Sequence, residues 1–258
     1  MNARNMETVT LRPVLAIGCI VAMVGFAAPA QAAMVSLTAN ADVDIRSADL
    51  ANHGFDRTVM VIGNGGGDPA TQRNFKGYVR FELPADFGTA NSATFELTRA
   101  VARSFNAGMN VSGLNDGSAD NWLEVNGSNI GPVGSDPNLV GVSWNNGPGN
   151  ITTSPSDFSN SSLLGTFTTL GTNNGGASGD TYSISGAGLV NFLNADSNGF
   201  VTLLLGRNNV SSQQEQWASS EHASLAPPTL ILDYTPVPEP ASLALMGLSG
   251  LVLMARKR

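Results

Sequence analysis

Several short segments of this chain alternate apolar and polar side chains with a period of two, and this pattern constrains the fold most strongly. In residues 78–83, the apolar Val79, Phe81 and Leu83 alternate with charged side chains, and residues 93–97 repeat the pattern. Such alternation places one set of side chains on each face of a β-strand. Further strands are predicted at residues 109–111, 200–205 and 229–234.

Turn-forming sequences separate these segments. Residues 63–67, 145–148 and 173–176 are rich in Gly and Asn, which tolerate the positive φ angles of tight turns. Residues 188–194 predict one short helix. Many short strands joined by such turns are typical of an all-β fold, and we predict an antiparallel jelly-roll β-sandwich.

The first 32 residues have the order of a secretory signal peptide. Arg4 and Arg12 precede the apolar run 14–26, and Ala30 and Ala32 form an A-x-A cleavage site. We therefore predict a signal peptide at residues 1–32 that is cleaved after Ala32. Cleavage also removes the only cysteine, which excludes a disulfide framework and a cysteine zinc site in the mature protein.

The last 23 residues form a second targeting segment. A proline-rich start is followed by the apolar residues 241–255 and by three terminal cations. At 1.5 Å per residue the apolar helix would reach about 22 Å, which is shorter than the roughly 30 Å hydrocarbon core. The terminal cations should stay on the cytoplasmic side of the membrane.

This segment resembles the PEP-CTERM sorting signal of Gram-negative bacteria, with Val237, Pro238, Glu239 and Pro240 as its motif. The resemblance implies that residues 236–258 anchor the chain transiently in the inner membrane through a hydrophobic sorting helix. It further implies processing by an exosortase-type enzyme near residues 238–240, and export to the cell surface or an extracellular matrix.

The segment between the two targeting sequences is strongly acidic. The whole chain of 258 residues has a formal net charge of −7, but residues 33–235 contain 18 acidic and 8 basic residues, a net charge of −10. This balance excludes nucleic acid as a partner, because nucleic-acid binding depends on clustered Lys and Arg. An acidic surface favours cations or neutral glycans as ligands, and a merely solvated acidic face is the alternative.

Motifs along residues 33–235 resemble, in their order, those of DNRLRE domains. The resemblance implies a jelly-roll β-sandwich related to modules, some of them carbohydrate-binding, that are appended to polysaccharide-degrading enzymes. The matching segments are residues 42–47, 77–83, 92–97, 122–124, 142–148, 217–221 and 228–234.

Two tryptophans are candidates for carbohydrate binding. Trp122 and Trp144 lie in Asn-, Asp- and Gly-rich surroundings, and an exposed indole can stack on the apolar face of a sugar ring. The alternative is that these indoles fix their loops against the core, with each N–H bonded to the backbone.

Calcium is a possible cofactor. Asp116, Ser118 and Asp120 alternate as in the first half of a calcium loop, although the Gly and Glu that complete an EF-hand are missing. Residues 194–199 have a similar composition but are better explained as a hairpin turn. Asp42 and Asp44 share one face of a strand, and Glu221 is a further candidate for an acidic cluster there.

No catalytic motif is evident in the sequence. The only histidines, His53 and His222, lie outside any nucleophile-elbow motif, and nothing singles out a carboxylate pair for glycoside hydrolysis. We therefore predict an exported, non-enzymatic protein of the cell surface or extracellular matrix that binds or organises exopolysaccharide. The alternatives are a structural matrix protein without a specific ligand, and a polysaccharide lyase or hydrolase.

Overall fold

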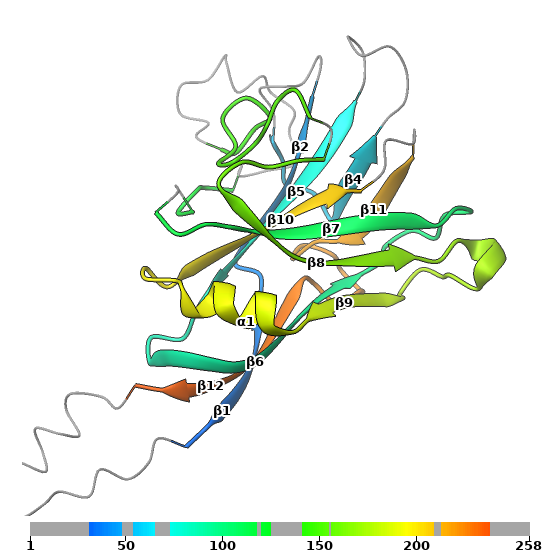
Figure 1. Ribbon diagram of the computed structural model, residues 1–258. Coiled ribbons are helices and arrows are strands. Elements are labelled where there is room, and N and C mark those ends of the chain that lie inside the picture. The colour runs from blue at the N-terminus through cyan, green and yellow to red at the C-terminus, as the bar shows by residue number, and fades with distance from the viewer. Residues whose placement is uncertain are drawn as a thin grey trace, which may run out of the picture.

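The computed structural model describes residues 31–47, 54–64, 73–117, 120–124, 141–154, 156–208 and 213–237. Within these residues the chain forms two antiparallel sheets that pack face to face (Figure 1). This arrangement confirms the predicted all-β sandwich. Residues 1–30 of the predicted signal peptide and residues 238–258 of the C-terminal segment lie outside the described residues.

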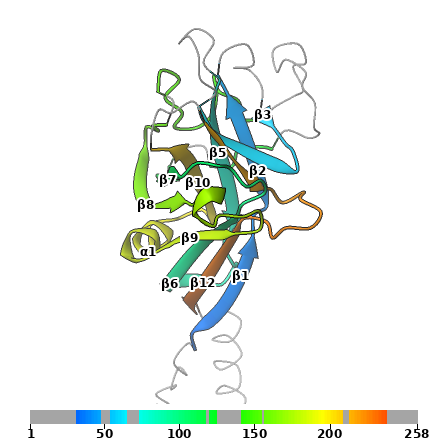
Figure 2. The same ribbon diagram turned by 90° about the vertical axis from the view of Figure 1, so that its right-hand side faces the viewer.

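The first sheet has four strands, which Figure 2 shows side by side in the lower part of the molecule. Their order is β1 (Ala33–Thr38), β12 (Thr229–Pro236), β6 (Phe87–Thr98) and β9 (Thr181–Ser185). Because Ala33 pairs with Tyr234, the start of β1 and the end of β12 are neighbours. The two targeting segments are therefore attached at the same end of the sandwich.

The second sheet is larger. Its main order is β11 (Gln214–Ala218), β4 (Val59–Asn64), β5 (Asn74–Glu82), β10 (Phe200–Arg207), β7 (Ala107–Leu114) and β8 (Ser161–Thr169). In addition, β2 (Ala41–Arg46) pairs with β5 and with the short β3 (Gly54–Phe55). The strands predicted from alternation correspond to β5, β6, β7, β10 and β12.

Among the residues that the structure describes, two helical segments interrupt the strands. The predicted short helix is α1 (Ala187–Asn194), and a 3-10 turn, η2 (Thr172–Asn174), lies between β8 and β9. Residues 195–199 connect α1 to β10, so this segment joins a helix to a strand and is not the hairpin turn that we expected.

The main core lies between the two sheets. Phe81 of β5 meets Phe95 of β6 edge-on, with ring centroids 6.0 Å apart, and Leu230 and Leu232 of β12 are fully buried beside them. These side chains belong to the apolar set of each alternating strand. The alternation thus identifies the face that each strand turns toward the other sheet.

A second core covers the opposite face of the larger sheet. Tyr78 of β5 and Leu204 of β10 pack there against Trp122, Trp144 and other apolar side chains. Burial on both faces explains why almost every residue of β5 and β10 is buried.

Lys76 stabilises the loop that covers this second core through hydrogen bonds. The side chain is fully buried, and its Nζ donates to Asn150 Oδ1 at 2.7 Å, Ile151 O at 3.1 Å and Asp157 O at 2.7 Å. It also lies 4.8 Å from the centre of the Trp144 ring. Burial lowers the pKa of Lys76 to about 7, and the charge of Asp157 opposes this shift.

Candidate functional site

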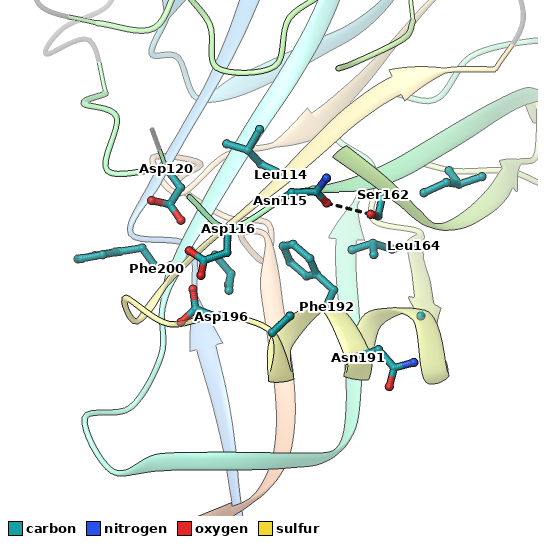
Figure 3. Close-up of a pocket in the computed structure, with 14 residues that line it drawn as sticks. Leu114, Asn115, Asp116, Asp120, Ser162, Leu164, Asn191, Phe192, Asp196 and Phe200 are labelled. Atoms are coloured by element: carbon teal, nitrogen blue, oxygen red, sulfur yellow. Dashed lines mark hydrogen bonds between the residues drawn. The ribbon is translucent and has the colours of Figure 1, made fainter. Parts of the chain in front are cut away.

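A pocket of about 490 Å³ opens between the β7–β8 pair and α1 (Figure 3). Its apolar lining includes Leu114, Leu164, Phe192 and Phe200. Polar side chains share the lining, and Asn115 Oδ1 accepts a hydrogen bond from Ser162 Oγ at 2.9 Å. The pocket therefore offers both an apolar surface and hydrogen-bonding groups.

Three carboxylates converge on one side of this pocket. One oxygen from each of Asp116, Asp120 and Asp196 lies within 4.8 Å of the other two, and Figure 3 shows the three groups facing one another. Asp116 and Asp120 follow the end of β7, whereas Asp196 precedes the start of β10. Since β7 and β10 are antiparallel neighbours, the end of one strand lies beside the start of the other.

Each of these carboxylates already accepts a hydrogen bond. Asp116 accepts from Ser197 Oγ at 2.5 Å, Asp120 from Asn198 Nδ2 at 2.9 Å, and Asp196 from the Gly199 N–H at 2.7 Å. Burial raises the pKa of Asp196, and the charges of Asp116 and Asp120 add to this rise.

The structure therefore brings together two of the three predicted calcium ligands. Ser118 lies outside the described residues, and Asp196 joins Asp116 and Asp120 instead. The sequence signal for Asp196 was its Asn- and Asp-rich segment, which resembles the one around Asp116. Calcium binding by Asp116, Ser118 and Asp120 stays a prediction.

The two candidate tryptophans are buried. Trp122 is 6% exposed and Trp144 is 3% exposed, and both belong to the second core. The Trp122 indole N–H donates to Thr202 Oγ1 at 2.9 Å, and that of Trp144 donates to Thr152 O at 3.2 Å. The indoles therefore fix their loops, and their burial leaves little ring surface for a sugar to stack on.

A positively charged side chain also lies over each of these rings, Arg80 over Trp122 and Lys76 over Trp144. The Arg80 guanidinium lies 5.2 Å from the centre of Trp122, and its Nη1 donates to Trp122 O. Tyr78 meets Trp122 edge-on at 5.9 Å. Arg80 and Tyr78 thus contribute to holding the 120–124 segment against the larger sheet.

The one described histidine has a structural role. His222 Nδ1 accepts hydrogen bonds from the Ser224 N–H at 3.3 Å and the Leu225 N–H at 3.0 Å. This nitrogen is therefore engaged in a turn. His53 lies outside the described residues.

The end of β12 leads directly into the C-terminal sorting segment. The Val237 N–H donates to Asp86 O at 2.8 Å, which holds the first motif residue against the sandwich, whereas Pro238, Glu239 and Pro240 lie outside the described residues. A family model for the PEP-CTERM protein-sorting motif matches residues 236–258. The chain is thus an exported protein that is anchored transiently at the membrane and sorted by an exosortase.

No curated protein has a sequence that matches this chain. Over the residues that the structure describes, no helix is both long enough and apolar enough to span a membrane.

Proposed function

We propose that this protein is a non-enzymatic β-sandwich of the cell surface or extracellular matrix that binds polysaccharide in the pocket beside α1. The observation that carries the proposal is the composition of this pocket, where Phe192 and Phe200 adjoin carboxylate and amide groups. A sugar ring presents apolar C–H faces together with hydroxyl groups, and this combination complements such a lining. The volume of about 490 Å³ lies within the usual range of ligand sites.

The charge of the domain favours a neutral glycan. Residues 33–235 have a net charge of −10, and three carboxylates line the pocket itself. An anionic polysaccharide would be repelled by this surface, whereas neutral hydroxyl groups can donate hydrogen bonds to the carboxylates.

Two further observations support this role. The PEP-CTERM sorting motif directs the protein out of the cell, which agrees with a ligand that is met outside it. The resemblance of residues 33–235 to DNRLRE domains agrees with a carbohydrate-binding module.

Retention of the protein on a panel of immobilised neutral and acidic glycans tests the proposal. We expect at least one neutral glycan to retain the protein, and Ser162→Trp to weaken retention roughly tenfold by filling the pocket from the exposed side of β8. Asn173→Trp is the matched control, because Asn173 is exposed and does not line the pocket. Retention by no glycan, or equal retention of both variants, would refute the proposal.

A structural matrix protein without a specific ligand is the second candidate. Burial of Trp122, Trp144 and Trp217 favours it, because exposed indoles are common anchors for sugars and these three are internal. The same panel separates the two functions, since a purely structural protein is retained by none of the glycans. Release of sugar products during the assay would instead indicate a lyase or hydrolase.

A further inference from the structure

A second group of carboxylates lies outside the lining of the pocket. Asp42 belongs to β2, Glu124 follows Trp122 by two residues, and Glu221 follows β11. One oxygen from each carboxylate lies within 4.8 Å of the other two. Asp42 and Glu221 are both candidates for an acidic cluster by sequence, whereas Asp44, on the same strand as Asp42, pairs with Arg57 at 2.6 Å.

Hydrogen bonds hold these three segments together. The Asp42 N–H donates to Glu124 Oε1 at 2.9 Å, and the Ser220 N–H donates to Asp42 Oδ2 at 2.7 Å. Ser220 Oγ in turn donates to Glu221 Oε1 at 2.6 Å. The bonds join residues that are 82 and 178 positions apart in the sequence, so the tertiary fold maintains this cluster.

The other oxygen of Asp42 lacks a partner. Asp42 is 1% exposed, and its Oδ1 accepts no hydrogen bond from any described residue. A buried carboxylate oxygen without a donor is costly, and two further carboxylates beside it increase that cost. Among the described residues, by contrast, no buried oxygen of the pocket carboxylates Asp116, Asp120 and Asp196 is left without a hydrogen-bond partner.

The surrounding charges leave the cluster negative. Asp56 adds a fourth carboxylate to the field at Asp42 and Glu124, and Arg80 acts on Glu124 as a cation. Burial, together with the charges of Glu221 and Asp56, raises the pKa of Asp42 and of Glu124 to about 7. A bound cation would offset this repulsion.

We propose that Asp42, Glu124 and Glu221 bind one calcium ion, and we name this cluster the β2 calcium site. Calcium takes oxygen ligands at about 2.3–2.6 Å, so two ligands on opposite sides of the ion are about 5 Å apart. Oxygens within 4.8 Å of one another therefore fit around calcium as they stand. Magnesium demands a stricter octahedral geometry and retains several of its waters, and zinc prefers nitrogen or sulfur donors.

The ion would connect three parts of the domain. It would join β2, the segment that carries Trp122, and the turn after β11. Calcium sites of extracellular modules have dissociation constants of about 10⁻⁴–10⁻³ M, and an exported protein works in that setting.

Calorimetric titration of the full-length chain in detergent, with calcium chloride as the ligand, tests the proposal. We expect one calcium ion per chain with a dissociation constant on the order of 10⁻⁴ M. At about 10 mM calcium the midpoint of thermal unfolding should then rise by about 5–10 °C. An unchanged midpoint, or an equal response to magnesium, would overturn the proposal.

Three variants locate the ion. Glu221→Gln changes an exposed residue and should not impair folding, and Asp42→Asn preserves the shape of the buried group. Both should abolish the calcium-dependent rise in midpoint. Asp196→Asn is the control in the pocket and should keep it. Loss of the rise in Asp196→Asn, with its retention in Glu221→Gln, would place the ion in the pocket and refute the β2 calcium site.

Discussion

Glu215→Gln should strongly destabilise the sandwich, because Glu215 forms a buried ion pair that joins the two sheets. Glu215 lies in β11 of the larger sheet, and Arg99 follows β6 of the smaller one. Arg99 Nε and Nη2 each donate to the carboxylate at 3.0 Å, and both side chains are fully buried. Thr169 Oγ1 adds a third bond at 3.2 Å.

The substitution keeps the shape of the side chain and removes its charge. Arg99 is then left without its anion in the interior, where Arg207, which is 1% exposed, also loses a favourable interaction with Glu215. Removing one partner of a buried ion pair costs about 3–5 kcal/mol. In a domain of this size, 1 kcal/mol lowers the unfolding midpoint by about 2–4 °C, so we expect a drop of about 6–20 °C.

Thermal unfolding followed by circular dichroism measures this effect. Glu82→Gln is the matched control, because Glu82 is exposed at the end of β5 and its loss should change the midpoint by less than about 2 °C. Replacing both partners, as Arg99→Met with Glu215→Leu, should recover much of the stability, since neither member of the ion pair is then left as a buried charge without the other.

Burial raises the pKa of Glu215, while the charge and hydrogen bonds of Arg99 oppose this rise. If Glu215→Gln unfolds within about 2 °C of the wild type, then Arg99 does not depend on a charged partner, and the ion pair does not hold the sheets together.

Two further predictions concern the loop over the second core and the pocket. Lys76→Met should reduce the dependence of stability on pH. The pKa of Lys76 is about 7 in the folded protein and 10.5 in the unfolded chain, so folding releases a proton between these two pH values. The stability of the wild type therefore rises with pH in this range, and the variant should lose this rise. Urea unfolding at several pH values measures this, and parallel profiles for the two proteins would contradict it. Gly113→Ala places a Cβ 2.4 Å from Phe192 Cε2, so this pocket-lining ring must shift at a cost of about 1–3 kcal/mol. A wild-type unfolding midpoint together with unchanged glycan retention would show that the ring is not confined as described.

The strands and turns of the sandwich could be predicted from the sequence because each depends on residues that are close together in the chain. A period of two in residues such as Val79, Phe81 and Leu83 follows directly from the geometry of a strand, and the turns depend on Gly and Asn at single positions. The acidic character of the domain follows directly from its composition, and the sorting motif is formed by contiguous residues. Both can therefore also be recognised from the sequence alone.

The sites depend on pairing between distant strands, and local sequence does not encode it. Asp196 reaches Asp116 because β7 and β10 are antiparallel neighbours, and Asp42 reaches Glu221 across most of the chain. The burial of Trp122 follows from a second core on the outer face of the larger sheet, which alternation alone does not reveal. Period two identifies the two faces of a strand, but only the packed structure decides whether one face or both are covered, and which charges meet there.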